Sequence, residues 1–223
     1  MTPEEAAQSA RPRVDGDREQ QIFHATLTVL AEMGYDNMTL DAVATAAHAS
    51  KATLYRRWNG KLPLVIDALK SMKASTSVPD TGNLRDDLLA TYCSPGGVTD
   101  HASVDTFASV LTAVTRDPDF AEVFRAEIVE PKMVAARAIY RRAQERGEIP
   151  ADADVDLFAH SLAGIVLHRH YVLGSFPDDD LVARVLDQII LPALHHAPGG
   201  PATPPPAEPA TPQTQTTPEE GTS

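Results

Sequence analysis

The chain has 223 residues, 43% of them hydrophobic, with one cysteine and a formal net charge of -12, so it can build one large or two small domains but no internal disulfide. No apolar run approaches the roughly 18–20 residues of a membrane span, and the N-terminal residues lack the apolar core of a signal peptide, which argues against membrane and secreted proteins. We expect a soluble cytoplasmic protein, because a reducing compartment suits a chain with a single cysteine.

The negative charge is unevenly distributed along the chain. Residues 1–73 hold nine Lys or Arg and nine Asp or Glu, whereas residues 74–223 hold ten and twenty-two. Within the neutral part, residues 51–61 carry four positive charges and no negative one. One part of the protein can therefore approach nucleic-acid phosphates while the other stays away from them.

Residues 1–16 are polar and contain Arg11 and Arg13, and we expect a flexible arm there. This arm is either a disordered end or a basic segment that reaches along DNA, and the sequence leaves both open. A first helix is predicted over residues 17–33, where apolar side chains recur at three- and four-residue steps. Gly34 stands where a left-handed C-terminal cap ends a helix.

Two short helices separated by a tight turn are predicted over residues 39–58. Thr39 and Ser50 suit their N-caps, because a side-chain oxygen there accepts from a free backbone N–H. In the second helix, Leu54 and Trp58 lie four residues apart and are predicted to be buried. The remaining arc presents cations and hydroxyls to solvent: Lys51, Thr53, Tyr55, Arg56 and Arg57. A helix-turn-helix with a basic outer arc indicates DNA as the partner.

A fourth helix, predicted from residue 61 to about 73, is apolar on nearly all sides, which indicates that it connects two cores. The turn-rich residues 74–82 mark a domain boundary. Beyond it, helical periodicity recurs in five segments: 83–92, 101–115, 118–146, 155–173 and 180–195. Pro131 must kink or split the third of these segments.

No stretch shows sustained strand alternation, so the predicted fold class is all-α, with an N-terminal three-helix helix-turn-helix domain and a C-terminal helical domain. From residue 198 onward proline and threonine are frequent and large apolar residues are absent, so we expect a disordered tail. The predicted organisation is an arm at 1–16, the helix-turn-helix domain at 17–73, the second helical domain at 74–196 and the tail at 197–223.

The first half contains, in order, Arg18–Ile22, Ala31–Tyr35, Met38–Ala44, Ala46–Ala47 and Ser50–Trp58. In spacing and in their glycine, cap and aromatic positions, these segments resemble the DNA-binding domain of TetR-family transcriptional regulators over residues 17–70. The second half contains Asp117–Phe120, Glu130–Pro131, Arg142–Glu148 and Gly164–Arg169 in an order similar to the ligand-binding domain of one branch of that family. Two places depart from the pattern: His48 replaces the turn glycine, and the sequence at 59–63 differs around the lysine at position 61.

This resemblance implies that residues 50–58 form a recognition helix in the major groove of DNA, with backbone contacts from the flanking helix ends. The implied DNA contacts are Thr39, Ser50, Lys51, Ala52, Thr53, Tyr55, Arg56, Arg57 and Lys61. The implied partner is a palindromic double-stranded operator.

The resemblance also implies that the C-terminal domain serves ligand binding and dimerisation. The last two helices are expected to pair with those of a second copy, through Leu162, Ile165, Val182, Val185 and Ile189. A small apolar effector is expected in a pocket among the helices of residues 83–173. Its candidate lining residues are Tyr92, Phe107, Leu111, Phe124, Ile128, His168 and Tyr171.

The implied function is a ligand-responsive transcriptional regulator, expected to be a homodimeric repressor that a small apolar molecule releases from its operator. The alternative is an all-helical small-molecule-binding protein with weak or lost DNA binding. A metal-responsive regulator is disfavoured, because His168 and His170 place their rings about 200° apart on a helix and no carboxylate or CxxC group completes a site. We expect no metal, no cofactor and no enzymatic activity, since no nucleophile–base arrangement or phosphate loop occurs, and Cys93 is interpreted as a small helix-face residue.

Overall fold

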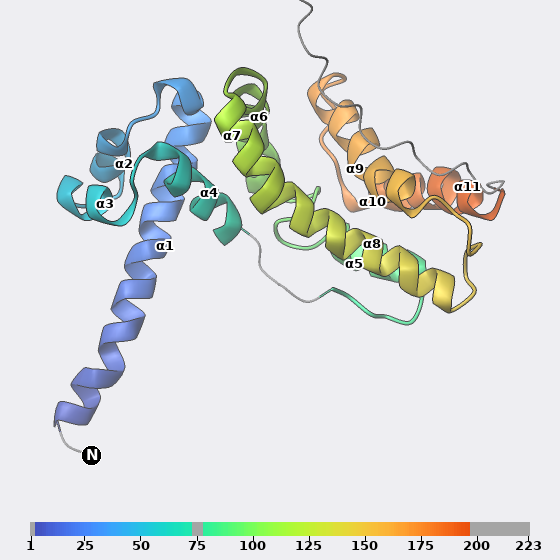
Figure 1. Cartoon of the computed structure of the whole chain (residues 1–223), viewed down its shortest axis with the longest axis horizontal. Helices are drawn as coiled ribbons and strands as arrows, with labels where there is room; N and C mark the ends of the chain where they lie inside the picture. Colours follow the sequence, from blue (N-terminus) through green and yellow to red (C-terminus); the bar gives the residue numbers. More distant parts are fainter. Residues whose placement is uncertain (1–2, 73–77, 197–223) are drawn as a thin grey trace, which may run out of the picture.

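The chain folds into helices joined by turns, and the described residues contain no strand (Figure 1). The computed structural model describes residues 3–72 and 78–196. The N-terminal part comprises α1 (Pro3–Asn37), α2 (Leu40–Ala46), α3 (Lys51–Arg57) and α4 (Lys61–Ser71). The remainder comprises α5 (Leu84–Tyr92), α6 (His101–Arg116), α7 (Pro118–Phe124), the π-helix η1 (Arg125–Val129), α8 (Glu130–Glu145), α9 (Val155–Tyr171), α10 (Asp179–Val185), the π-helix η2 (Leu186–Ile190) and α11 (Leu191–His196). The predicted all-α fold class is confirmed.

Some expectations fall wholly or partly on residues outside the described ranges. The tail predicted at 197–223 lies outside them, as do residues 1–2 of the predicted arm and residues 74–77 of the predicted domain boundary. Across the described ranges, no helix has both the length and the apolar character that crossing a bilayer requires.

Helix α1 is longer than the sequence predicted. It begins at Pro3, so most of the segment expected to be a flexible arm is helical. Proline at the first helical position, followed by Glu4 and Glu5 in the first turn, favours a helix start and outweighs the polar composition on which the arm was predicted. The predicted break at Gly34 is confirmed, because this residue has φ 73° and ψ 162°.

The predicted helix-turn-helix is present as α2 and α3, and both N-caps are formed. Thr39 Oγ1 accepts a hydrogen bond from the backbone N–H of Ala42 at 3.1 Å, and Ser50 Oγ accepts from that of Thr53 at 3.1 Å. Each cap satisfies one backbone donor that the first turn of a helix leaves unpaired. The two short helices therefore start at defined residues, which fixes the faces they present.

The first hydrophobic core extends beyond the N-terminal helices. Buried side chains of α1 to α4 pack with Val110 and Ala113 of α6 and with Phe120 and Phe124 of α7. The boundary predicted at 74–82 is therefore not a boundary between two hydrophobic cores, because the first core contains residues from both sides of it. Two helices from the C-terminal side belong to the same packed unit as the helix-turn-helix.

A second core lies among α5, α8, α9, α10 and η2. Tyr140 of α8 is fully buried at its centre, and its hydroxyl donates to the backbone oxygen of Phe158 at 3.2 Å. This core holds the C-terminal helices together in Figure 1 as a layer apart from α1 to α4.

Each of the two π-helices directly precedes a proline-containing helix start. Segment η1 ends one residue before the Glu130–Pro131 pair, and η2 ends immediately before Leu191 and Pro192. Proline has no N–H and its ring clashes with the carbonyl four residues earlier, and a widened turn accommodates both defects. The predicted kink or split at Pro131 takes the form of a π-helical turn in a continuous helical backbone, since Phe124, Val129 and Glu130 all keep right-handed helical φ and ψ. The similar turn before Pro192 was not predicted.

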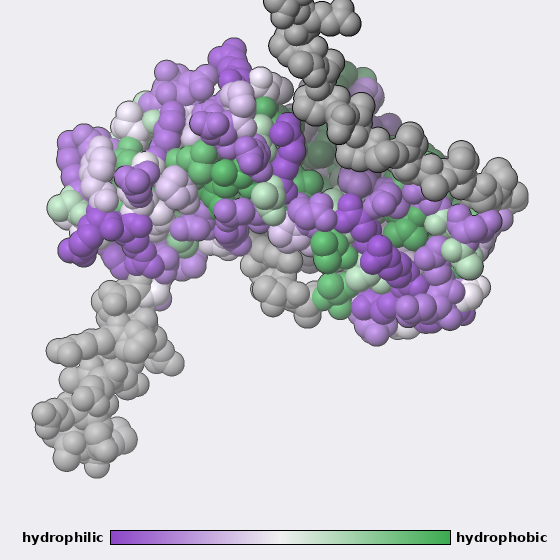
Figure 2. All heavy atoms as spheres, viewed as in Figure 1, coloured by the Kyte–Doolittle hydropathy of each residue, from purple (hydrophilic) through white to green (hydrophobic). Residues whose placement is uncertain are grey.

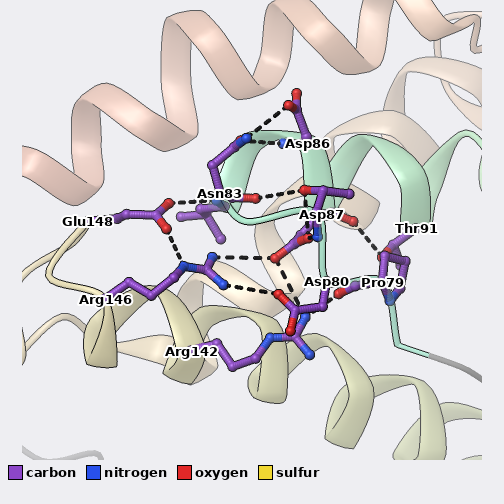
Figure 3. A network of polar contacts seen from close by, with 11 residues as sticks. Pro79, Asp80, Asn83, Asp86, Asp87, Thr91, Arg142, Arg146 and Glu148 are labelled. Atoms are coloured by element: carbon purple, nitrogen blue, oxygen red, sulfur yellow. Dashed lines mark hydrogen bonds and ion pairs between the residues drawn. The ribbon is translucent and has the colours of Figure 1, made fainter.

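A polar network fastens the start of α5 to the end of α8 (Figure 3). The fully buried carboxylate of Asp87 accepts from the backbone N–H and the hydroxyl of Thr81, at 2.5 and 2.8 Å. The guanidinium groups of Arg142 and Arg146 approach the same carboxylate at 3.5 and 3.4 Å. Arg142 also donates to the backbone oxygen of Pro79. The segment that enters α5 is thus held by the last turns of α8.

The charge state of Asp87 follows from these contacts. Burial alone raises the pKa of its carboxyl, but the hydrogen bonds from Thr81 and Arg146 and the charge of Arg142 outweigh burial, so the pKa is lowered overall. The buried carboxylate is therefore ionised and its charge is balanced by two arginines.

Candidate nucleic-acid interface

Helix α3 lies at one end of the molecule and presents one buried face and one exposed face (Figure 1). Leu54 and Trp58 are buried in the first core, as predicted, and the indole N–H of Trp58 donates to Asp67 at 2.9 Å. Phe23 of α1 meets the Trp58 ring edge-on at 5.9 Å. These contacts fix the rotation of α3 about its axis, and with it the direction of every other side chain on the helix.

The opposite face of α3 is exposed, and the end of the molecule that carries it is largely hydrophilic (Figure 2). Tyr55 is 57% exposed, and Lys51, Ala52, Arg56 and Arg57 are exposed as well. A large aromatic side chain with this exposure has no role in the core of the monomer. Five of the predicted DNA contacts are therefore exposed on α3, on the arc left free by Leu54 and Trp58.

The predicted contacts Thr39, Ser50 and Thr53 lie at helix N-termini. The hydroxyls of Ser50 and Thr53 are hydrogen-bonded to each other at 2.8 Å, in addition to the cap that Ser50 makes. Thr39 is exposed at the start of α2. A helix N-terminus of this kind presents backbone N–H groups that suit a phosphate, with the hydroxyls at the same edge.

The turn between α2 and α3 contains a strained residue at the position where the family pattern has glycine. His48 has φ 50°, a left-handed conformation that is uncommon for a side chain with a Cβ. Arg18 of α1 donates to the backbone oxygen of His48 at 2.5 Å, and the N–H of Ala49 donates to the carbonyl of Ala44 at 2.8 Å. Sequence reasoning missed this role of Arg18, because nothing local pairs it with a residue thirty positions away.

Two cations of the exposed face are ion-paired to carboxylates of the preceding helices. Lys51 Nζ lies 2.5 Å from Asp41 Oδ2 on α2, and Arg57 lies 2.5 Å from Glu19 Oε1 on α1. The hydrogen bond to Asp41 and the charge of that carboxylate raise the pKa of Lys51, so its ammonium group stays protonated. The guanidinium of Arg57 also lies over the ring of Trp58, 5.2 Å from the centroid. The sequence did not reveal either pair.

Lys61 is placed apart from the other predicted DNA contacts. Its ammonium group donates to the backbone oxygens of Tyr35 and Asp36, at 2.7 and 3.3 Å, and lies over the Tyr35 ring at 4.3 Å from the centroid. Lys61 thus satisfies carbonyls that the break at Gly34 leaves unpaired. Burial and nearby carboxylates raise the pKa of Tyr35 to about 12.

Some of the predicted effector residues come together and others do not. The ring of Phe107 lies 6.2 Å from that of Phe124 and 6.3 Å from that of Tyr171, between α6, α7 and α9. Ile128 is half-buried beside the first core. Tyr92 belongs instead to the second core, where its hydroxyl lies 3.4 Å from the backbone oxygen of Ala159.

Leu111 and His168 are exposed, so in this structure they line no enclosed apolar site. Two cavities, of 150 and 460 Å³, are lined by other residues. The smaller lies between the end of α1 and α6, and the larger lies beside residues 99–101 and 176–180. Of the predicted effector residues, Phe107, Phe124 and Tyr171 form a packed aromatic group, and neither of these two cavities is lined by any of the seven.

Three of the predicted dimer contacts are corrected by the structure. Leu162, Val182 and Val185 are buried in the second core of the monomer and cannot meet a second copy while that core is intact. Ile165 is half-buried and Ile189 is 49% exposed. Helix α9 carries apolar side chains on several faces, so the sequence pattern did not distinguish the face that packs inward.

Exposed apolar side chains do occur on the same C-terminal helices. Leu157, near the start of α9, is 62% exposed, and Val172 and Leu173 are exposed just after its end. Leu157, Gly164 and His168 follow one exposed face of α9 at helical spacing.

Two further observations concern the groups considered for metal binding and for nucleophilic chemistry. Within residues 3–72 and 78–196, no three His, Cys, Asp or Glu side chains are grouped so that they could hold a metal ion. Burial and a hydrogen bond with Asp179 raise the pKa of the Cys93 thiol to about 12, which makes it a poor nucleophile.

Comparison with known proteins gives consistent matches over both halves of the chain. Residues 22–68 match the model of the bacterial regulatory proteins of the tetR family, and residues 78–189 match the model of the tetracyclin repressor-like C-terminal domain. The chain is 38% identical over 186 residues to the HTH-type transcriptional regulator Rv1556 of Mycobacterium tuberculosis, covering 82% of this chain and 90% of that protein. It is 34% identical to the DNA-binding transcriptional repressor TetR of Mycobacteroides abscessus, covering 78% and 92%. Among solved structures, the TetR family transcription regulator SCO0332 aligns with a TM-score of 0.61 at 27% identity, covering 78% and 97%.

Proposed function

The chain belongs to the TetR family of bacterial regulatory proteins and is a ligand-responsive DNA-binding transcriptional regulator, and we propose that it represses transcription as a homodimer on a palindromic operator. One recognition helix reads only a few base pairs, and two copies one helical turn apart, about 34–36 Å, extend the site. The related repressor of Mycobacteroides abscessus supports the repressor assignment.

The observation that carries this proposal is the two-faced geometry of α3. Leu54 and Trp58 lock the helix into the core, and the exposed face then projects Tyr55 and Arg56 outward. An exposed arginine can pair with two acceptors of guanine in the major groove, and a tyrosine hydroxyl can bind phosphate. We assign base reading to Arg56 and phosphate contacts to Lys51, Tyr55 and the caps of α2 and α3.

The homodimer is supported by the exposed apolar side chains of the C-terminal helices. Leu157 and Val172 of the α9 region and Ile189 of η2 are each about half exposed or more. Helices α9 and η2 pack against each other, and exposed apolar side chains on neighbouring helices can form an interaction site. We propose that this surface pairs with its copy, in place of the buried residues that the sequence predicted.

We propose the aromatic group of Phe107, Phe124 and Tyr171 as the effector site. Ring contacts continue from it into the helix-turn-helix unit: Phe124 stacks near Phe120 at 6.0 Å, and Phe120 lies 4.5 Å from Tyr35 at the end of α1. An apolar molecule that separates these rings shifts α6 and α7 against α1. Any effector that prefers this shifted state weakens DNA binding by the same factor by which DNA weakens effector binding.

A DNA-binding measurement tests the proposed function. The probe is a labelled duplex from the intergenic region upstream of this protein's own gene, titrated with the full chain at two salt concentrations. We expect Arg56→Ala to weaken binding about 10- to 100-fold, the effect of removing a bidentate arginine contact. Arg184→Ala, which removes an exposed arginine of α10, is the matched control and should change nothing. Absence of a salt-sensitive complex for the wild-type chain would favour the alternative, a helical ligand-binding protein without DNA binding.

A further inference from the structure

The exposed face of α3 is partly neutralised by the protein itself. Among the residues that the structure describes, Arg56 has no carboxylate partner, whereas Lys51 is paired with Asp41 and Arg57 with Glu19. Both carboxylates are partly exposed and come from helices that precede α3. The surface proposed to meet DNA therefore already contains two anions at hydrogen-bond distance from its cations.

The Asp41–Lys51 pair is the more readily exchanged of the two. Lys51 is 63% exposed, and Asp41 supplies the contact that holds its ammonium group. Arg57 is held a second time by the Trp58 ring, so it is less free to leave Glu19. Within the described part of the chain, the other oxygen of Asp41, Oδ1, is buried and accepts no hydrogen bond. Asp41 is therefore left without a neutralising group whenever Lys51 turns to a phosphate.

An exchange of this kind alters the salt dependence of DNA binding. A free lysine that neutralises a phosphate releases a counterion from DNA, and each such contact adds about 0.9 to the slope of log K against log salt. When Lys51 leaves Asp41 for a phosphate, the carboxylate takes up a cation from solution. The release and the uptake then nearly cancel, so this contact adds little affinity and little salt dependence.

We propose that Asp41, with a smaller contribution from Glu19, competes with DNA phosphate for the cations of α3 and so lowers both the affinity and the salt dependence of DNA binding. This inference rests on the proposed function. The competing carboxylate weakens the Lys51 contact to phosphate on operator and on other DNA alike, and it does not touch the base contacts. Asp41 thus acts on DNA affinity through Lys51.

The test compares Asp41→Asn with the wild-type full chain on two duplexes. One is about 30 base pairs of the upstream intergenic DNA, enough for two half-sites one turn apart, and the other has the same composition in shuffled order. Affinity is measured by fluorescence anisotropy between about 50 and 200 mM salt. We expect Asp41→Asn to bind shuffled DNA about 5- to 10-fold more tightly at low salt, with a slope steeper by about 0.9 per protomer. Affinity for the operator should rise by a similar factor, because the same Lys51 contact to phosphate is strengthened there.

Asp36→Asn is the matched control. It removes the same charge from the same packed unit, at an exposed aspartate whose partner is Arg116 at 3.2 Å, away from α3. A double variant, Asp41→Asn with Lys51→Ala, separates the local exchange from a general charge effect. Once Lys51 is absent, the Asp41→Asn substitution should have no effect on the slope.

Three outcomes are decisive. A steeper slope for Asp41→Asn that disappears in the Lys51→Ala background supports the inference. Equal slopes and equal affinity for shuffled DNA in Asp41→Asn and Asp36→Asn overturn it, while operator binding by the wild-type chain leaves the proposed function intact. If the wild-type chain binds neither duplex at low salt, the inference and the proposed function are both rejected.

Discussion

At the scale of single residues, Asp87 shows how a buried charge is retained. Its carboxylate is fully buried, and Arg142 and Arg146, the two arginines that balance it, keep about a quarter of their side-chain surface exposed. We expect Asp87→Ala to lower the free energy of unfolding by about 3 kcal/mol, because it removes a buried ion-pair partner and three or more hydrogen-bond acceptor contacts. Urea denaturation followed by circular dichroism measures the change.

Asp80→Ala is the control for this prediction. Asp80 lies 3.5 Å from Arg146, against 3.4 Å for Asp87, but it is exposed, and an exposed pair contributes less than about 1 kcal/mol. Similar losses for the two variants would show that burial does not determine the contribution of Asp87.

The same carboxylate predicts the response to acid. Its pKa is lower in the folded chain than the value near 3.9 of an unfolded aspartate, so its stabilising contribution is complete above about pH 4 and is lost as the pH falls through the folded value. The pKa values of Asp156 and Asp187 are also lowered, by hydrogen bonds from Arg137 and Arg85, although both aspartates are exposed. The urea concentration at the midpoint of unfolding, measured from pH 6 downward, should decrease once the pH is below about 4. In Asp87→Asn this decrease should be smaller. An unchanged acid profile in this variant would contradict the assignment.

The exposed face of α3 was predictable at residue scale, but the pairing of its charges was not. Leu54 and Trp58 at helical spacing predicted which side is buried, and the other side followed. The pairs of Lys51 with Asp41 and Arg57 with Glu19 join residues ten and thirty-eight positions apart. Such pairs depend on how helices cross, which periodicity does not encode.

At the scale of elements, Gly34 ends the regular part of α1 in a conformation that is accessible to glycine and very few other residues. The restriction comes from the backbone conformation, φ 73° and ψ 162°. It does not come from a lack of space, because an added Cβ would meet no atom within 4 Å. We expect Gly34→Ala to cost about 2 kcal/mol of stability. Thermal unfolding followed by circular dichroism measures this loss.

Gly16→Ala on the same helix is the control, because its Cβ also meets nothing within 4 Å and its φ lies outside the left-handed range. It should stabilise the chain by about 0.5–1 kcal/mol, the difference in helix propensity between glycine and alanine. Equal effects of the two substitutions would mean that the backbone conformation of Gly34 carries no strain.

Helix boundaries were predicted best where a local signal marks them. Helix α7 starts at Pro118 as predicted, capped by Asp117, and α5 starts one residue after the predicted start, because Asn83 is its N-cap. The start of α1 and the π-helix before Pro192 were missed. Pro3 favours the start of α1, and Pro192 favours the π-helical turn before it. Both effects come from the backbone of proline, and the spacing of apolar residues contains no information about them.

At the scale of the whole molecule, the exposed apolar side chains of α9 lead us to expect a homodimer that forms through this helix. We expect Leu157→Asp to convert the proposed dimer to a monomer, because it places a charge in an apolar contact, and to weaken operator binding in parallel. Size-exclusion chromatography with light scattering measures the mass. Val134→Asp, on α8 and 56% exposed, should leave the dimer intact. A dimer that persists in Leu157→Asp would place the interface elsewhere.

The sequence by itself determined the all-α fold, the position of the helix-turn-helix, its caps and the buried face of α3. These features depend on contacts within about four residues, which periodicity and capping chemistry encode directly. Only the tertiary structure decided that α6 and α7 share the core of the DNA-binding unit and that Leu162, Val182 and Val185 are buried within one chain. It also decided that carboxylates of α1 and α2 hold the cations of α3. Helices that are apolar on several faces can pack in more than one way, and the choice among those packings depends on contacts between residues far apart in the sequence.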